Sequence, residues 1–129
     1  MNAVDTNVLL YACDKSDMRR HAIAKKIITQ TEGGVLVWQV AAEFVAAARR
    51  LETRGLTREI AWARLKNFLR VYRLVLPSRP ILEHAQRLHV EQQWSFWDAM
   101  IVGACLEAGV TRLYSEDLPG RAAPSPLEI

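Results

Sequence analysis

Short apolar segments alternate with longer helical segments along the chain, and this alternation is the strongest constraint on its fold. The short segments are rich in branched residues that favour strands, whereas the long ones repeat their apolar residues at helical spacing. The order is strand, two helices, strand, two helices, strand, two helices and strand. Because strands joined through helices lie parallel, this order predicts an α/β fold with a central, mostly parallel sheet flanked by helices.

Turn and capping residues indicate where these elements begin and end. Gly33-Gly34 and Gly55 interrupt helical patterns, whereas Thr57 is a suitable N-cap and Pro80 suits a first helical turn. The predicted strands are 2–4, 35–38, 72–76 and 112–114. The predicted helical segments are 6–13, 19–31, 39–51, 58–70, 80–93 and 96–108. The last of these is apolar almost all round, which is typical of a buried helix.

The length of 129 residues suits one domain over residues 1–129, and half of the residues are hydrophobic, as in an ordinary globular protein. Neither a repeat nor a linker divides the chain. The segment 118–129 contains Pro119, Pro124 and Pro126, so we expect it to be irregular, with at most a short edge strand at its end. The sheet therefore has four strands, or five if that edge strand forms.

The chain is expected to be a cytoplasmic protein. Its start, MNAVDTNVLL, lacks the basic and apolar regions of a signal peptide, and no apolar run approaches the ~20 residues of a membrane span. Cys13 and Cys105 lie far apart in apolar surroundings and match no zinc-binding spacing. Buried free thiols in a reducing compartment are the expected state of both residues.

Four acidic residues stand at places where parallel sheets bind ligands, which is outside the carboxyl ends of the strands. Asp5 directly follows the first strand, Glu43 lies early in the helix after the second, and Asp117 lies just past the fourth. Asp98 lies near the start of the buried helix. Apolar neighbours make Asp5 and Asp98 costly to bury without partners.

Each acid also has a structural explanation. Asp5 suits an N-cap, Asp98 suits a capping box with Ser95, Glu43 suits an exposed helix position and Asp117 suits a turn. Gathered in one pocket, however, carboxylates repel by ~4 kcal/mol per pair at 4 Å and an effective dielectric of 20. Protons or a cation must then neutralise them. All-oxygen ligands without histidine favour Mg²⁺ or Mn²⁺, which orient a phosphodiester and lower the pKa of a water.

A basic stretch runs from Arg49 to Arg73, where eight basic residues face only Glu52 and Glu59. Such a stretch attracts polyanions, but a solvated helix face explains it as well. We take phosphate contact by Arg49 and Arg50 as a hypothesis for nucleic-acid binding.

Four blocks of the sequence together resemble the PIN-domain ribonucleases, most closely the VapC-type toxins of bacterial toxin–antitoxin pairs. These blocks occur in the order of the family and span essentially the whole chain: VDTNVLLYA (4–12), QVAAEF (39–44), SFWDAMIVGAC (95–105) and YSEDL (114–118). The resemblance implies a PIN-like fold and an endoribonuclease that uses Mg²⁺ or Mn²⁺.

The resemblance also implies roles for individual residues. Its catalytic, metal-binding acids correspond to Asp5, Glu43, Asp98 and Asp117. Asp5 and Asp98 are expected to contact the metal directly, whereas Glu43 and Asp117 act through waters or a second metal. The residues expected to support the site are Thr6, Asn7, Ser115 and Glu116.

The partners that the resemblance implies are an RNA substrate, a second copy of the chain in a homodimer, and an antitoxin whose C-terminal segment occupies the active-site groove. Two departures from the family pattern stand out. Val37 and Trp38 are apolar where many relatives have a Ser or Thr before the Glu. The segment LPGRAAPSPLEI replaces a further strand and closing helix, which bears on how firmly Asp117 is held.

Two other functions fit parts of the pattern. A PIN-fold module that binds RNA or protein with reduced or no catalysis would keep the same blocks. A phosphotransfer or receiver-like domain also places acids at strand ends, but the chain has no DxD after its first strand and no Walker loop. Metal-dependent cleavage of RNA would separate the ribonuclease from both alternatives.

Overall fold

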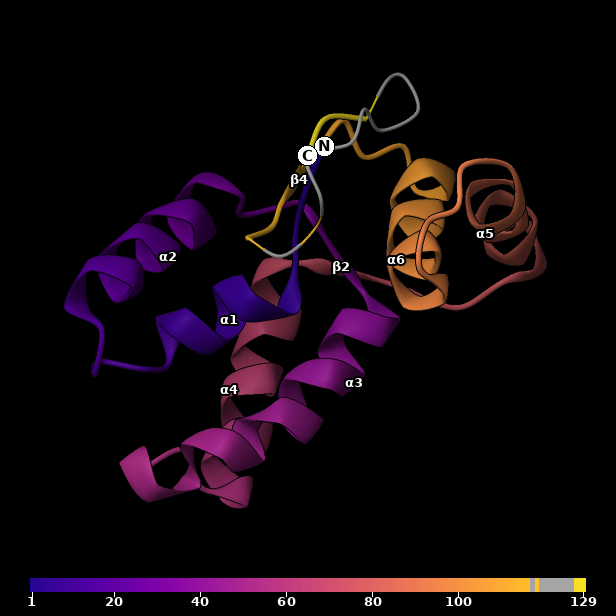
Figure 1. Cartoon of the computed structure of the whole chain (residues 1–129). Helices are drawn as coiled ribbons and strands as arrows, with labels where there is room; N and C mark the ends of the chain where they lie inside the picture. The colour runs from indigo at the N-terminus through magenta and orange to yellow at the C-terminus, as the bar shows by residue number, and fades with distance from the viewer. Residues whose placement is uncertain (117, 119–126) are drawn as a thin grey trace.

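A four-stranded parallel sheet lies at the centre of the computed structural model (Figure 1). The structure describes residues 1–116, 118 and 127–129. The strands are β1 Asn2–Val4, β2 Val35–Val37, β3 Arg73–Val75 and β4 Arg112–Tyr114, in the order β3-β2-β1-β4. Every pairing among these strands is parallel, which confirms the predicted α/β fold.

Helices cover both sides of this sheet. They are α1 Thr6–Ala12, α2 Met18–Gln30, α3 Trp38–Ala47, α4 Arg58–Val71, α5 Arg79–Glu91 and α6 Phe96–Glu107, with a 3₁₀ helix, η1 Ala48–Arg54, after α3. Figure 1 shows the α1–α2 pair and the α5–α6 pair on opposite sides of the strands. No helix within the described residues is long and apolar enough to cross a membrane.

The core forms between the sheet and the inner faces of the helices. Val4, Leu36 and Leu113 from three strands are buried there together with Phe44 of α3 and Val102 of α6. Burial removes apolar surface from water and is the main force that holds the layers together. The resulting frame fixes the residues at the carboxyl ends of the strands.

The predicted helix over 39–51 differs from the structure at both ends. Trp38, expected in a strand because it is aromatic, begins α3 instead and is exposed. From Ala48 the helix tightens into η1, which ends at Gly55, whose φ of 96° is open to glycine at no steric cost. Local propensity shows neither change, because tertiary packing decides where a helix begins and tightens.

The last described residues lie beside β4. A single parallel bridge joins Glu128 to Arg112, and the backbone N–H of Leu113 donates to the carbonyl of Glu128 at 2.8 Å. Among the described residues this bridge is the whole extension of the sheet beyond β4. It agrees with the expectation of at most a short edge strand.

Candidate active site

Asp5 lies where β1 ends and α1 begins, and hydrogen bonds from its backbone and its side chain hold it there. Its backbone N–H donates to the carbonyl of Tyr114 at 2.9 Å, which continues the pairing of β1 with β4. Its Oδ1 accepts from the backbone N–H of Thr6 at 2.7 Å, and its Oδ2 accepts from the hydroxyl of Ser115 at 2.7 Å. The residue is only 7% exposed, and these donors offset the cost of burying its charge.

Glu43 of α3 is joined to Asp5 through Thr6. The hydroxyl of Thr6 donates to Oε2 of Glu43 at 2.9 Å, while its backbone N–H donates to Asp5. The other oxygen, Oε1, accepts from Nε2 of Gln39 at 2.8 Å. Thr6 therefore fixes two acids at once, although they lie 38 positions apart in the sequence.

Asp98 lies in the first turn of α6 and is partly buried. Its backbone N–H donates to the hydroxyl of the N-cap Ser95 at 3.4 Å, so the capping expected at this helix is present. Its carboxylate forms no hydrogen bond or ion pair with the described residues. Within the described part of the chain, the helix alone therefore positions this carboxylate.

The three acids line one groove with a volume of about 470 Å³. Asn7, Trp97 and Arg50 line the same groove. The fourth predicted acid, Asp117, lies outside the described residues. The structure therefore brings together Asp5, Glu43 and Asp98 on the side of the sheet edge where β1 ends, as the sequence predicted for these three.

The negative charge of the groove reaches the buried face of α6. Cys105 is fully buried, and its burial together with the charge of Asp5 raises the pKa of its thiol to about 12. Cys105 is therefore an inert thiol at neutral pH, as expected of a buried free cysteine. Burial also raises the pKa of the half-buried Cys13.

The residues that line the groove carry carboxylate, hydroxyl and amide oxygens. Oxygen ligands of this kind fit a hard divalent cation. Both polar side-chain atoms of Asn7 are buried without a hydrogen-bond partner among the described residues, which leaves an amide oxygen available. Within those residues, however, no three His, Cys, Asp or Glu side chains lie close enough together to hold an ion. The arrangement suits Mg²⁺ held by one or two carboxylates with waters completing its shell.

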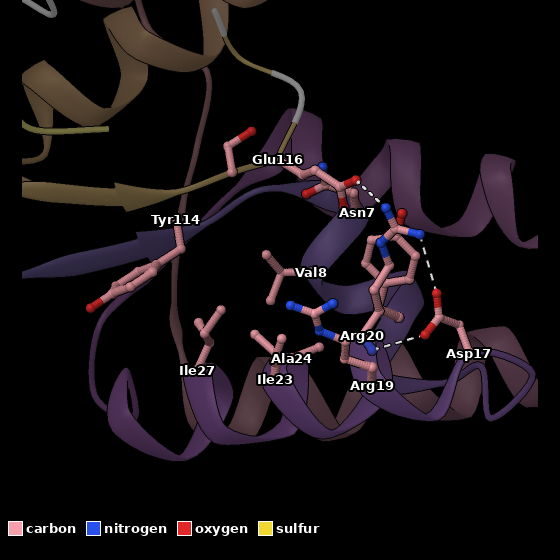
Figure 2. A pocket seen from close by; sticks show the side chains of 12 residues that line it. Asn7, Val8, Asp17, Arg19, Arg20, Ile23, Ala24, Ile27, Tyr114 and Glu116 are labelled. Atoms are coloured by element: carbon pink, nitrogen blue, oxygen red, sulfur yellow. Dashed lines mark hydrogen bonds and ion pairs between the residues drawn. The ribbon is translucent and has the colours of Figure 1, made fainter. Parts of the chain in front are cut away.

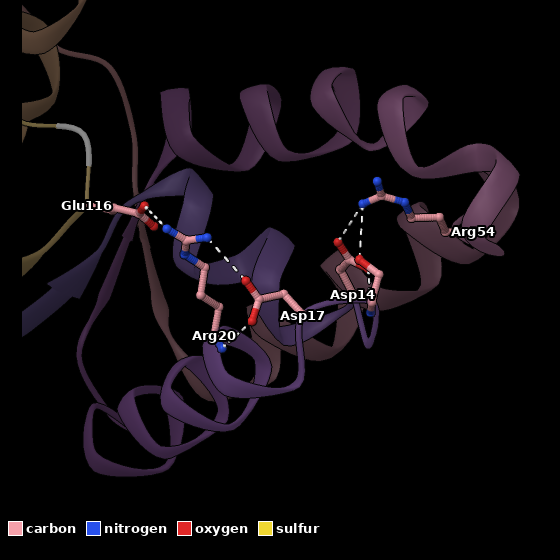
Figure 3. A network of polar contacts seen from close by, with 6 residues as sticks. Asp14, Asp17, Arg20, Arg54 and Glu116 are labelled. Carbon is pink, nitrogen blue, oxygen red and sulfur yellow. Dashed lines mark hydrogen bonds and ion pairs between the residues drawn. The ribbon is translucent and has the colours of Figure 1, made fainter.

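Glu116, for which the resemblance implies a supporting role, is not among the residues that line the acid groove. Its Oε1 accepts from the guanidinium of Arg20 on α2 at 3.3 Å, and the same guanidinium binds Asp17 at 3.1 Å (Figure 3). Ser115, the residue before it, turns inward to Asp5 and also accepts from the backbone N–H of Leu118 at 3.2 Å. The two adjacent side chains thus anchor this loop in opposite directions.

A second cavity of about 540 Å³ lies next to the groove, between α1, α2 and the end of β4 (Figure 2). Its floor is apolar and includes Val8, Ala24 and Ile27, whereas Arg20 and Glu116 lie at its rim. None of the three acids that line the groove, Asp5, Glu43 and Asp98, lines this cavity. The predicted metal-binding acids that the structure describes therefore line the acid groove and not this cavity.

The two arginines predicted to bind nucleic acid lie in different places. Arg50 lines the acid groove and a neighbouring cavity of about 360 Å³ that also contains Arg54. Arg49 instead lines a separate cavity beside Trp62. The geometry therefore supports phosphate contact near the acids for Arg50 and not for Arg49.

Two residues that contact or line the groove were not expected from the sequence: Gln39, which contacts its acid Glu43, and Trp97, which lines it. Gln39 binds Glu43 and also donates to the backbone carbonyl of Trp97 at 3.3 Å. Its spacing of four residues from Glu43 on one helix was a usable signal, because such residues lie on the same helical face. Trp97 precedes Asp98 and was visible only as part of a block of similar sequence.

Comparisons with known proteins concern the fold and the family of the chain. The structure resembles the crystal structure of VapC20 from Mycobacterium tuberculosis, a toxin that cleaves the Sarcin-Ricin loop, with a TM-score of 0.70. The similarity covers 91% of this chain and 90% of that one, at 22% sequence identity, and so concerns the fold. No curated protein sequence matches the chain significantly. The family model of the PIN domain matches residues 3–118, and the chain therefore belongs to the PIN domain family.

Proposed function

We propose that this protein is an endoribonuclease that depends on Mg²⁺ or Mn²⁺ and serves as the toxin of a toxin–antitoxin pair. The observation that carries this proposal is the fixed pair of Asp5 and Glu43, joined by Thr6 and facing one groove with Asp98 in a PIN domain. Likeness of fold to a toxin that cleaves RNA supports the choice of substrate.

In this proposal Asp5 and Asp98 hold the cation directly, and Glu43 acts through a water. When bound, the cation would supply Lewis acidity, orienting the phosphodiester and lowering the pKa of the attacking water. Thr6 and Ser115 keep the carboxylates of Asp5 and Glu43 oriented toward the groove through the bonds described above. Asp117, at the position of the fourth family acid, is proposed as a further support.

The proposed partners follow from the same assignment. They are an RNA substrate, a cognate antitoxin whose C-terminal segment fills the acid groove, and a second copy of the chain. We propose a cytoplasmic location, where the RNA is found.

A PIN-fold module that binds RNA without cleaving it is the second candidate. The observation in its favour is that no three potential ligand side chains among the described residues converge at metal-binding spacing. Binding of RNA without metal-dependent turnover would distinguish this module from the enzyme.

The deciding experiment incubates the purified protein with mixed cellular RNA and with a Sarcin-Ricin loop oligonucleotide, with Mn²⁺, with Mg²⁺ and with EDTA. We expect cleavage only with metal, and its loss in Asp5→Asn and Glu43→Gln. The matched control is Glu83→Gln, which makes the same change at an exposed glutamate paired with Arg79 and should cleave normally. Cleavage in EDTA, or equal cleavage by Asp5→Asn, would contradict the proposed mechanism.

A further inference from the structure

Three aromatic side chains remain exposed at the start of α3 and α6. Trp97 is 63% exposed, Trp38 is 48% exposed and Phe96 is 44% exposed. We call these three residues the aromatic shelf. Solvent-facing rings grouped in this way mark binding surfaces more often than scattered apolar residues do.

Trp97 connects the aromatic shelf to the acid groove. It lines the groove beside Asp98 and also lines a small apolar cavity of about 130 Å³ that contains Trp38 and Pro77. The surface is therefore continuous from the acids to the indole rings. A molecule seated over the acids would meet Trp97 next.

Trp97 is contacted at its ring and at its backbone. The ring of Phe96 packs edge-on against it, with the centroids 4.8 Å apart and the planes at 77°. The backbone carbonyl of Trp97 accepts from Gln39, which also donates to Glu43. The amide of Gln39 thus links the backbone of Trp97 on α6 to Glu43, an acid of the groove, on α3.

Arg50, the one cationic side chain among the described residues that line the groove, indicates the chemistry of its occupant. Arg50 lines the same groove as Trp97, and its guanidinium forms no ion pair with the described residues. A ligand that bears both an anionic group for Arg50 and a flat ring for Trp97 complements the two. Single-stranded nucleic acid has this combination, because each nucleotide carries a phosphate and a base.

We propose that Trp97 is a base-stacking residue, on which the base next to the reacting phosphate of single-stranded RNA lies. The proposal rests on the proposed ribonuclease function and names the subsite beside its acids. Stacking accepts any base, because every base has a flat π-face. The subsite therefore selects for unpaired nucleotides and not for one particular base.

The test measures binding by fluorescence anisotropy of a labelled single-stranded RNA 12-mer of random sequence. All proteins carry Asp5→Asn, so that the RNA stays intact. We expect Trp97→Leu to weaken binding about tenfold, since a stacked base contributes ~1–3 kcal/mol. Trp97→Phe should keep most of the affinity. The matched control Trp62→Leu removes an indole of 52% exposure on α4 and should bind as the parent does.

An abasic oligonucleotide of the same length and charge tests the contact itself. Trp97→Leu and the parent should bind this oligonucleotide equally, because it has no base to stack. An equal loss on both oligonucleotides would overturn the proposal. So would unchanged RNA binding by Trp97→Leu accompanied by a smaller mass in sedimentation equilibrium, because a second copy of the chain would then cover the aromatic shelf.

The outcomes also separate this inference from the proposed function. If the wild type cleaves RNA and Trp97→Leu binds RNA like the parent, only the stacking role fails. If RNA binds in a Trp97-dependent manner but is never cleaved, only the enzymatic proposal fails. If the wild type neither binds nor cleaves RNA, both proposals fail.

Discussion

Two groups of carboxylates in this protein have different kinds of partners. Along α1 and α2, Asp14 binds Arg54 at 3.0 Å, and Asp17 and Glu116 share Arg20 (Figure 3). In the acid groove, Asp5 and Glu43 instead accept from hydroxyl, backbone and amide groups. The first group uses guanidinium donors, which carry a positive charge and offset part of its negative charge. The hydroxyl, backbone and amide donors to the second group are neutral and orient the carboxylates without adding a positive charge.

The difference indicates which acids are available to a cation. A carboxylate bound by arginine has already gained its counter-charge, and a metal would have to displace it. Hydroxyl and amide donors orient a carboxylate without that competition, as is usual for residues that hold metal ligands. The type of hydrogen-bond donor therefore distinguishes acids in structural ion pairs from acids that are suited to bind a cation in the groove.

The largest effect that would test this comparison is expected from Thr6→Val. The change removes the hydroxyl bound to Glu43 but keeps the shape of the side chain and the backbone N–H bound to Asp5. We expect RNA cleavage to fall by about 10- to 100-fold. Thr29→Val is the control, since its exposed hydroxyl binds only the carbonyl of Lys25. Equal activity of both variants in a fluorogenic RNA assay would show that Glu43 needs no such donor.

Arg50 extends the comparison to the cations. Because Arg50 lines the groove and forms no ion pair with the described residues, Arg50→Ala should lower the slope of log affinity against log salt by about 0.7 for single-stranded RNA. Arg49→Ala, which lies beside another cavity, should keep the slope of the wild type. Identical slopes for both variants in binding titrations from low to high salt would contradict a phosphate contact at Arg50.

Arg20→Ala tests whether a paired acid can be turned toward the groove. Removal of the guanidinium frees Glu116 and loosens the loop whose Ser115 holds Asp5, so we expect a severalfold loss of activity with little change in melting temperature. The double variant Arg20→Ala, Glu116→Gln should regain none of this loss if the anchor is what matters. A gain of activity in the double variant would show instead that the released charge of Glu116 disturbs the groove.

The smallest effect on activity is expected from Asp14→Asn, which acts on stability. The backbone N–H of Ser16 and the guanidinium of Arg54 lower the pKa of Asp14 from its ordinary value of 3.8. Because the folded pKa is depressed, the stabilisation is present above pH ~4 and is lost as the pH falls through the folded pKa. Urea unfolding should therefore show a wild-type advantage at pH 7 that shrinks on acidification, while RNA cleavage changes little. A pH-independent difference would contradict the charge pairing.

Local patterns predicted much of this molecule. The caps Thr57 and Ser95 accept from the backbone N–H groups expected of them, and Pro80 lies in the first turn of α5. The gathering of Asp5 and Glu43 followed from the rule that parallel strands end at one edge. These features depend on neighbouring residues in the sequence or on one topological rule, and they can therefore be predicted from one sequence.

Hydrogen bonds and ion pairs between residues far apart in the sequence could not be predicted from local patterns. Glu116 meets Arg20 over a separation of 96 residues, and no spacing signals that choice. The donation by Gln39 to Trp97 depends likewise on how α3 and α6 pack. Burial of both polar atoms of Asn7 is a tertiary outcome too.

The hydrogen bond between Ser115 and Asp5 joins residues 110 positions apart, and this separation affects folding during synthesis on the ribosome. β1 pairs with β4, so the carboxylate of Asp5, which directly follows β1, is fixed only after β4 has been synthesised and has paired with β1. Contacts so distant in sequence form late, after the loop between them has closed. Until β4 is in place, Asp5 lacks its bonds to Ser115 and Tyr114, so we expect the nuclease that we propose to reach full activity only after this strand has been made and has folded.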